Sequence, residues 1–316
     1  MTEITLTSDT LQASIQTRGA TLTKFRWKET DTPLILEFSD PGDPIGRDVF
    51  AGVIVGPLAN RVRTPLHVNS VEYDLGQPKD SVVLHGGESG LSNETWSIEA
   101  HTDTQVMLTI FRAHMSDGFP GDRRITVTYS LSGATMSVEI IATSTEPTAF
   151  APAHHPYWTL GEPGGTKNMM LEVAADHVIP VDDRQLPTGE VMPVDATVFD
   201  HRTARTPDAT LDHNFCLTQN QRPTPEFACR LSAANGMVLD IDTTEPGLQV
   251  YSGSGLPSLA PSRTNGPVCA PLAAMALEPQ FWPNALEHPH FAQPLITSSY
   301  SFKQFSRYRL HSKHSP

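Results

Sequence analysis

The stretch ITVTYSLSGATMSVEI, residues 125–140, decides the fold class of this chain. Apolar side chains alternate with Thr, Ser and Glu on both sides of the short segment Ser132-Gly133-Ala134. Successive side chains of an extended strand point to opposite faces, so the pattern predicts two strands that each bury one face. The Ser-Gly-Ala segment between them is typical of a turn. We therefore predict an antiparallel β-hairpin over these residues.

The same alternation recurs along the chain, in residues 4–15, 105–111, 237–242 and 300–302. Gly, Pro, Asp or Ser bounds each of these stretches, and the 27 prolines among 316 residues leave little room for long helices. No repeat of fixed length is visible, which disfavours propellers and solenoids. We predict an all-β protein with a single domain over residues 1–316, and we expect residues 309–316 to form a frayed tail.

Composition excludes several classes of function. The chain has 22 Lys and Arg against 35 Asp and Glu, a formal charge of −13, and shows no basic cluster that would follow a phosphate backbone. We expect neither nucleic acid nor membrane as a partner, because no apolar run reaches the ~18 residues of a membrane helix. Three widely spaced cysteines without CxxC pairing argue against a disulfide framework and a zinc site, and favour a reducing cytoplasm.

Two glycine-rich or apolar segments in the first third of the chain carry polar side chains. Asn60 and Arg61 follow the apolar run AGVIVG, and a solvated strand end explains them as well as a ligand site does. His85 precedes two glycines in LHGG, where the backbone is free to adopt positive φ. Each segment alone is a weak signal.

The segment APAHHPYW, residues 151–158, places two histidines side by side. Strand geometry sends His154 and His155 to opposite faces, so adjacency alone does not bring them into one site. Pro156 favours an extended conformation for His155. Structural roles outnumber functional ones for such a pair, and no spaced motif such as HExxH indicates a metal site.

Two acidic residues complete the candidates. Asp212 leads into an apolar strand-like run, where a turn-forming aspartate is the simpler interpretation. Alternation in AMALEPQFW, residues 274–282, places Met275 and Leu277 on one face and Glu278 on the other, among small and aromatic neighbours. A carboxylate in such surroundings is costly unless it is paired, which makes Glu278 a candidate for a base with a shifted pKa.

Taken together and in order, these segments resemble the aldose 1-epimerases, the galactose mutarotase family. The resemblance spans nearly the whole chain and rests on these blocks: ANRV (59–62), LHGG (84–87), DGFPGD (117–122), HPYW (155–158), LPTGE (186–190) with DATVFDHR (195–202), DHNF (212–215), EPGLQVYSG (245–253) and ALEPQFWPNA (276–285). It implies a single large antiparallel β-sandwich, the supersandwich of galactose mutarotase-like proteins. It also implies an isomerase that interconverts the α and β anomers of a free aldose, such as galactose or glucose.

The resemblance assigns roles residue by residue. Glu278 falls on the catalytic base, His155 on the catalytic acid and His85 on a second active-site histidine near the ring oxygen. Sugar-binding positions fall on Asn60, Arg61, Asp212 and Gln249. The resemblance implies that neither a cofactor nor a metal is needed. It also implies a monosaccharide as the binding partner, and we expect a monomer or a homodimer. Opening a sugar ring requires one base and one acid together, which a carboxylate and a histidine provide.

The sequence differs from the family's usual blocks at several positions, and other functions are compatible with it. Pro57 stands where an arginine is common, and Ala153-His154 replaces a usual Thr-Asn. Trp158 and Trp282 are available to stack on a pyranose, although a tryptophan more often belongs to a core. Rival functions are a mutarotase for another or a phosphorylated sugar, glycoside hydrolysis by paired carboxylates, and a non-catalytic carbohydrate-binding sandwich.

Overall fold

The predicted hairpin is present and occupies the middle of the largest sheet. A computed structural model describes residues 1–312, and in it β12 (Arg123–Ser132) pairs antiparallel with β13 (Thr135–Ser144), with Tyr129 opposite Val138. The side chains predicted to face inward are buried, and Gly133 adopts φ +53° in the turn. Alternation thus set both the pairing and the buried face.

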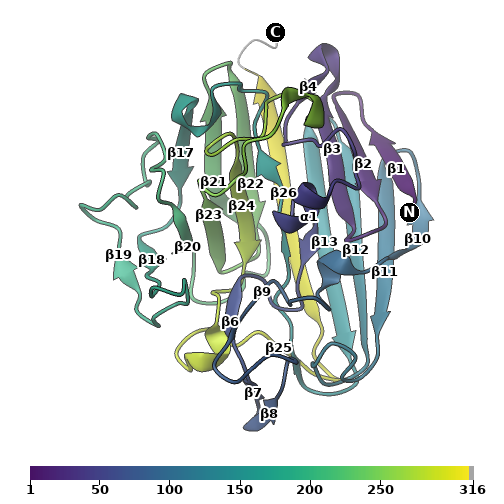
Figure 1. The fold of residues 1–316 in the computed structure, drawn as a ribbon, viewed down its shortest axis with the longest axis vertical. Coiled ribbons are helices and arrows are strands. Elements are labelled where there is room, and N and C mark those ends of the chain that lie inside the picture. Colours follow the sequence, from purple (N-terminus) through teal and green to yellow (C-terminus); the bar gives the residue numbers. More distant parts are fainter. Residues whose placement is uncertain (313–316) are drawn as a thin grey trace.

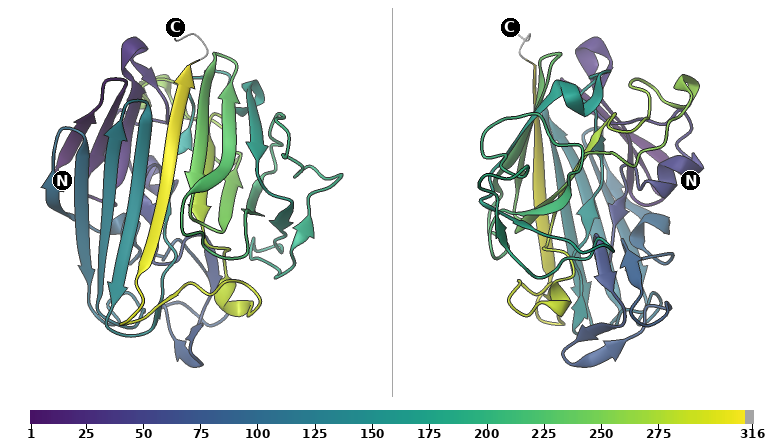
Figure 2. Two further views of the ribbon diagram at one scale, coloured as in Figure 1. Left: turned by 180° about the vertical axis from the view of Figure 1, so that it is seen from behind. Right: turned by 60° about the vertical axis from the view of Figure 1, so that its left-hand side comes forward.

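Eight strands form this sheet, which Figure 2 shows from behind as a row of long, neighbouring strands. Their order is β10 (Ser97–His101), β11 (Gln105–Arg112), β12, β13, β26 (Phe302–Ser312), β22 (Met237–Thr243), β21 (Glu226–Ala233) and β17 (Met169–Val173). All neighbours pair antiparallel.

Two smaller antiparallel sheets lie in front of it (Figure 1). One contains β1 (Glu3–Thr7), β2 (Leu11–Gln16), β3 (Thr21–Trp27) and β4 (Thr32–Pro33). The other contains, in spatial order, β16 (Tyr157–Trp158), β24 (Met275–Gln280), β23 (Gly247–Tyr251), β20 (Asp212–Cys216), β18 (His177–Ile179) and β19 (Met192–Pro193).

Short elements connect and cover these sheets. Four strand pairs are β5 (Ile54–Val55) with β15 (Ala153–His154), β6 (Arg61–Arg63) with β9 (Val82–Leu84), β7 (Leu66–Val68) with β8 (Val71–Tyr73), and β14 (Thr148–Ala149) with β25 (Leu295–Ile296). The helices are α1 (Pro44–Asp48) and the 3-10 turns η1 (Lys28–Thr30), η2 (Leu91–Asn93), η3 (Gly165–Asn168), η4 (Pro261–Arg263) and η5 (Ala285–Glu287). No helix of residues 1–312 has the length and apolar character needed to cross a bilayer.

The main core lies between the large sheet and the two smaller ones. Its apolar side chains come from all three, for example Phe25 on β3, Val127 on β12 and Leu277 on β24. The all-β prediction is therefore confirmed, with layers of antiparallel sheet facing one another. Trp158 belongs to this core, where it is fully buried, and Trp282 donates its Nε1–H to the carbonyl of Pro246.

Two details of the fold refine the sequence analysis. The expected tail from residue 309 is wrong for residues 309–312, because β26 continues to Ser312 in register with β22, and Leu310 is buried. Residues 313–316 lie outside the described residues. Asp117, the first residue of the block DGFPGD, forms a fully buried ion pair with Arg123, the residue that follows the block, with Arg123 Nη2 2.7 Å from Asp117 Oδ1.

Candidate active site

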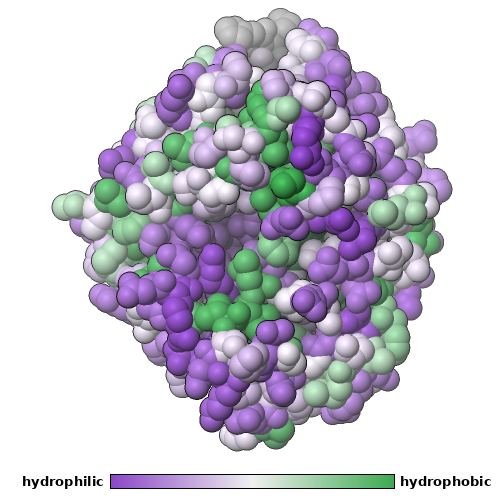
Figure 3. All heavy atoms as spheres, in the orientation of Figure 1, coloured by the Kyte–Doolittle hydropathy of each residue, from purple (hydrophilic) through white to green (hydrophobic). Residues whose placement is uncertain are grey.

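One cavity of about 210 Å³ gathers all seven predicted site residues: Asn60, Arg61, His85, His155, Asp212, Gln249 and Glu278. They come from segments spread over more than two hundred residues of chain, and the six-stranded sheet supplies three of them. The face of the molecule that carries β23, β24 and α1 is hollowed near its centre, with hydrophilic residues around the hollow (Figure 3). Neither Trp158 nor Trp282 lines the cavity, so the suggested stacking role for them is wrong.

Register and alternation explain how the sheet positions its side chains. Gln249 on β23 lies opposite Glu278 on β24. Their strand neighbours Leu248, Val250 and Leu277 are fully buried in the main core. Because side chains alternate along a strand, Gln249 and Glu278 face the other way, into the cavity.

Glu278 is a buried carboxyl group at the wall of the cavity. Its residue is 2% exposed, and its Oε2 has no hydrogen-bond partner among the described residues. Burial raises the pKa of Glu278 well above its usual range, the nearby charge of Asp212 raises it further, and Arg61 opposes both. The protonated form is therefore stabilised in the absence of a ligand.

His155 points into the cavity and His154 points away from it, as strand alternation predicts. His155 Nε2 lies 3.4 Å from Glu278 Oε1. His154 instead packs between the rings of Tyr129 and Tyr308 in the core, with centroid distances of 5.5 and 5.8 Å. Burial lowers the pKa of His155 to about 4 and that of His154 to about 3. Both rings are neutral near pH 7.

Asn60 and His85 hold one another through two hydrogen bonds. The backbone N–H of Asn60 donates to His85 Nδ1 at 3.0 Å, and the backbone N–H of His85 donates to the backbone carbonyl of Asn60 at 3.0 Å. Both residues adopt positive φ, +64° and +54°, which Asn and His tolerate better than most residues. Because Nδ1 accepts this hydrogen bond through its lone pair, the neutral ring carries its proton on Nε2, and burial keeps the pKa of His85 well below its usual range.

Three polar side chains form a connected row at the rim. Gln249 Nε2 donates to Asp212 Oδ1 at 2.7 Å, and Asp212 Oδ2 lies 3.7 Å from Arg61 Nη1. Gln249 is buried, whereas the side chains of Arg61 and Asp212 are 25% and 28% exposed. The row offers both donors and acceptors to hydroxyl groups, which suits a sugar.

The geometry of the histidines and Glu278 also permits a test for metal binding. Ligand atoms of His85, His155 and Glu278 lie within 4.8 Å of one another, close enough to surround an ion. A metal needs an unprotonated nitrogen from each histidine. His85 uses its lone pair on Nδ1 for the Asn60 N–H and presents a protonated Nε2. The trio is therefore better suited to exchanging protons than to holding a metal.

The cavity also contains residues that the sequence did not single out. Tyr157 and Tyr251 line it, with ring centroids 6.2 Å apart, and Phe50 lines it from the turn after α1. Tyr157 belongs to the block HPYW, where its position two residues after His155 indicates the same face of the strand. Phe50 lies in the stretch DVFAGV, which carries no signal of this kind.

Comparisons with known proteins agree over nearly the whole chain. The family sequence profile described as aldose 1-epimerase matches residues 2–303. The galactose mutarotase of Homo sapiens is 31% identical over 306 residues, which cover 92% of this chain and 88% of the human protein. The aldose 1-epimerase of Escherichia coli K12 is 30% identical over 294 residues, covering 87% of this chain and 84% of that protein.

Two solved structures have the same fold. An aldose epimerase homologue from C. elegans superposes with a TM-score of 0.88 at 28% identity, over 98% of this chain and 99% of that one. The galactose 1-epimerase of Lactobacillus acidophilus gives a TM-score of 0.84 at 25% identity, over 99% and 95% of the two chains. These similarities confirm the expected galactose mutarotase-like sandwich.

Proposed function

This chain belongs to the aldose 1-epimerase family, a family of isomerases, and from that premise we propose that it interconverts the anomers of a free aldose such as galactose or glucose. In this proposal Glu278 is the base and His155 the acid. One observation carries it: His155 Nε2 lies 3.4 Å from Glu278 Oε1 at the buried end of a polar cavity.

The reaction moves two protons in opposite directions. Glu278 removes the proton of the anomeric hydroxyl while His155 protonates the ring oxygen, so the bond between C1 and the ring oxygen breaks and an open-chain aldehyde forms. Rotation about C1–C2 turns the other face of the aldehyde toward the returning oxygen. Ring closure then reverses both proton transfers and restores Glu278 and His155.

Burial sets where the proton of the unliganded pair lies. It raises the pKa of Glu278 and lowers that of His155, which favours the form with the proton on Glu278 and a neutral His155. The reactive form carries that proton on His155, so that Glu278 is an ionised base and His155 is a charged acid. A sugar that replaces water in the cavity supplies hydroxyl groups to both, and proton transfer needs no large change in net charge.

The remaining side chains supply orientation. The row of Gln249, Asp212 and Arg61 offers charge-assisted hydrogen bonds that hold ring hydroxyls. His85 presents its Nε2–H as a donor, because its Nδ1 accepts a hydrogen bond from the backbone N–H of Asn60. Holding the ring at several points places both reacting oxygens near the pair, which is worth a large part of the barrier in reactions of this kind.

Anomer exchange in freshly dissolved sugars tests the proposal. α-D-Galactose and α-D-glucose are followed by polarimetry and by NMR of the anomeric protons, in dilute buffer because buffers also catalyse mutarotation. We expect the wild-type protein to accelerate equilibration, with a rate proportional to enzyme concentration. A panel of further free aldoses and hexose 6-phosphates identifies the preferred substrate.

If no free aldose equilibrates faster, the proposal fails. Saturable sugar binding without acceleration would instead support a carbohydrate-binding sandwich. Acceleration confined to phosphorylated sugars would transfer the same chemistry to another substrate class.

A further inference from the structure

Phe50 occupies an unusual backbone conformation at the wall of the active cavity. It follows α1 with φ +58°, a region that residues with side chains seldom adopt and that persists where the surrounding structure fixes it. Such outliers gather at functional sites. Nothing in the proton chemistry described above uses this residue.

The Phe50 ring contacts both active-site histidines. Its centroid lies 4.7 Å from that of His85 and 6.3 Å from that of His155, while the two histidine rings lie 5.3 Å apart in an edge-to-face arrangement. The three rings therefore form one aromatic cluster. Aromatic contacts at these distances have preferred orientations, so each ring restricts the others.

His155 depends on this cluster more than His85 does. A hydrogen bond at the second ring nitrogen usually orients a catalytic histidine, and His85 has one from Asn60. His155 Nδ1 is buried and has no hydrogen-bond partner among the described residues. Its ring is held instead by Phe50, His85 and Tyr157, whose centroid lies 5.1 Å away.

The backbone around Phe50 is tied to the backbone of His155. The Gly52 N–H donates to the His155 carbonyl at 2.9 Å, and the His155 N–H donates to the Val53 carbonyl at 3.0 Å. At the other end of α1, Asp43 accepts the Ile45 N–H and pairs with Arg263, with Nη2 2.6 Å from Oδ1. The segment 43–53 is thus anchored at both ends.

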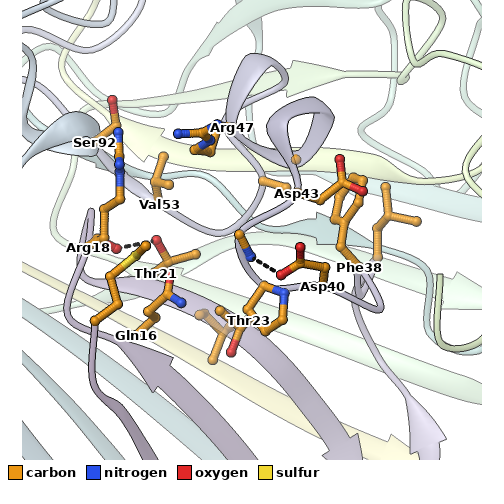
Figure 4. A pocket seen from close by; sticks show the side chains of 17 residues that line it. Gln16, Arg18, Thr21, Thr23, Phe38, Asp40, Asp43, Arg47, Val53 and Ser92 are labelled. Carbon is orange, nitrogen blue, oxygen red and sulfur yellow. Dashed lines mark hydrogen bonds between the residues drawn. The ribbon is translucent and has the colours of Figure 1, made fainter. Parts of the chain in front are cut away.

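A second pocket lies beside the same segment. Phe38, Asp43, Arg47 and Val53 are among its lining residues (Figure 4). This pocket leaves α1 without close packing on that side. The hydrogen bonds between residues 52–53 and His155, and the pairing of Asp43 with Arg263, therefore hold Phe50 against the histidines.

We propose that Phe50 is a positioning residue for the proton transfers: its ring fixes the orientation of His155 and excludes water from the space between the two histidines. This inference rests on the proposed function. In this inference, the apolar ring of Phe50 orients His155, as a hydrogen bond at Nδ1 orients other catalytic histidines.

Replacement of Phe50 by glycine is the direct test, because glycine adopts φ +58° without strain while the ring is lost. We expect kcat to fall by about ten- to a hundredfold with KM changed less than about threefold, since misorientation affects transfer more than binding. Water that enters beside His155 relieves its desolvation, so its pKa rises from about 4 toward 6.5. The acid limb of the pH–rate profile then moves to higher pH.

Two further variants serve as comparisons. Phe50→Leu retains apolar volume without the ring, and we expect the acid limb to return toward its wild-type position. Phe111→Ala removes a 62% exposed ring on β11 and leaves kcat and the pH profile unchanged. The other titratable groups that line the cavity with His155 stay the same in all three variants, namely Asp48, Arg61, His85, Tyr157, Asp212, Tyr251 and Glu278.

Histidine NMR separates this inference from the proposed function. The imidazole signals of His155 are titrated in wild type and in Phe50→Gly, which requires no catalytic activity. A raised His155 pKa in the variant supports the positioning role even if no sugar is turned over. Unchanged kcat and an unchanged His155 titration in folded Phe50→Gly overturn it, and so does an effect on KM alone.

Discussion

His155 Nε2 lies 3.4 Å from Glu278 Oε1, although the two residues are 123 positions apart in the sequence and do not share a strand. Glu278 lies within β24, whereas His155 precedes β16, the strand that pairs with β24 through Tyr157 and Ala276. The pairing of these two strands therefore brings the segment that carries His155 close to Glu278.

Removing either member of the pair is expected to abolish most turnover. Glu278→Gln and His155→Asn each delete one proton-transfer group, which is worth about 10²- to 10⁴-fold in kcat. His154→Asn is the matched control, because His154 lies in the core with Tyr129 and Tyr308. We expect it to retain most of its kcat per folded molecule, as measured by NMR anomer exchange alongside thermal unfolding. Equal losses at the two histidines would contradict the assignment.

The pH–rate profile of kcat is expected to be bell-shaped. The active pair holds one proton. Below a pH of about 4 it gains a second one, because burial lowers the pKa of His155 to that value. At high pH it loses its only proton, and the raised pKa of Glu278 places this limb above the usual carboxyl range. A profile that rises monotonically with pH would indicate that only a base is needed.

Asp212→Asn is expected to weaken sugar binding and to shift the alkaline limb. A neutral amide oxygen replaces the charged acceptor, which weakens a charge-assisted hydrogen bond by about 1 to 1.5 kcal/mol, so KM rises roughly tenfold. The charge of Asp212 also raises the pKa of Glu278. Without it that pKa falls, and the pair loses its proton at a lower pH. Steady-state kinetics across pH check both effects, and an alkaline limb that stays in place would show that the two carboxyl groups are not coupled.

Glu245→Gln is expected to stabilise the fold at high pH only. Burial raises the pKa of Glu245 to about 8, against 4.5 for the unfolded chain. Between these values the unfolded state releases a proton that the folded state retains, so stability falls as pH rises. The loss amounts to at most about 5 kcal/mol. Thermal melts should show no gain for the variant at pH 4 and a clear gain at pH 8, with exposed Glu99→Gln as the control. A gain of equal size at both values would contradict the shifted pKa.

Part of the molecule follows from local sequence alone. Alternation predicted the hairpin of β12 and β13, the opposite faces of His154 and His155, and the placement of Glu278 on the face opposite Leu277. Alternation did not predict that β22 would be buried at every position. Its outer face is covered because Asp240 pairs with Arg230 and Asp242 pairs with Arg309, contacts that depend on neighbouring strands.

Other features depend on long-range packing that no local pattern contains. Phe50 reaches the site because the turn after α1 is hydrogen-bonded to the backbone of His155. Trp158 is core because β16 lies against β26, where it contacts Tyr308. The continuation of β26 to Ser312 depends on pairing with β22, because the pairing with β13 ends at Arg309. The family resemblance predicted the seven cavity residues as a set. The distances between them became known only from the folded structure.

The buried pair of Asp117 and Arg123 has a consequence for how relatives of this chain diverge. Losing Asp117 leaves Arg123 without its carboxylate partner in the interior, a change that costs several kcal/mol and that selection for a folded protein alone would oppose. Asp117 would therefore persist in descendants that had lost Glu278 and, with it, the base of the proposed reaction. The Asp117–Arg123 pair would then mark shared descent, whereas Glu278 on β24 would mark the descendants that retain the proposed base.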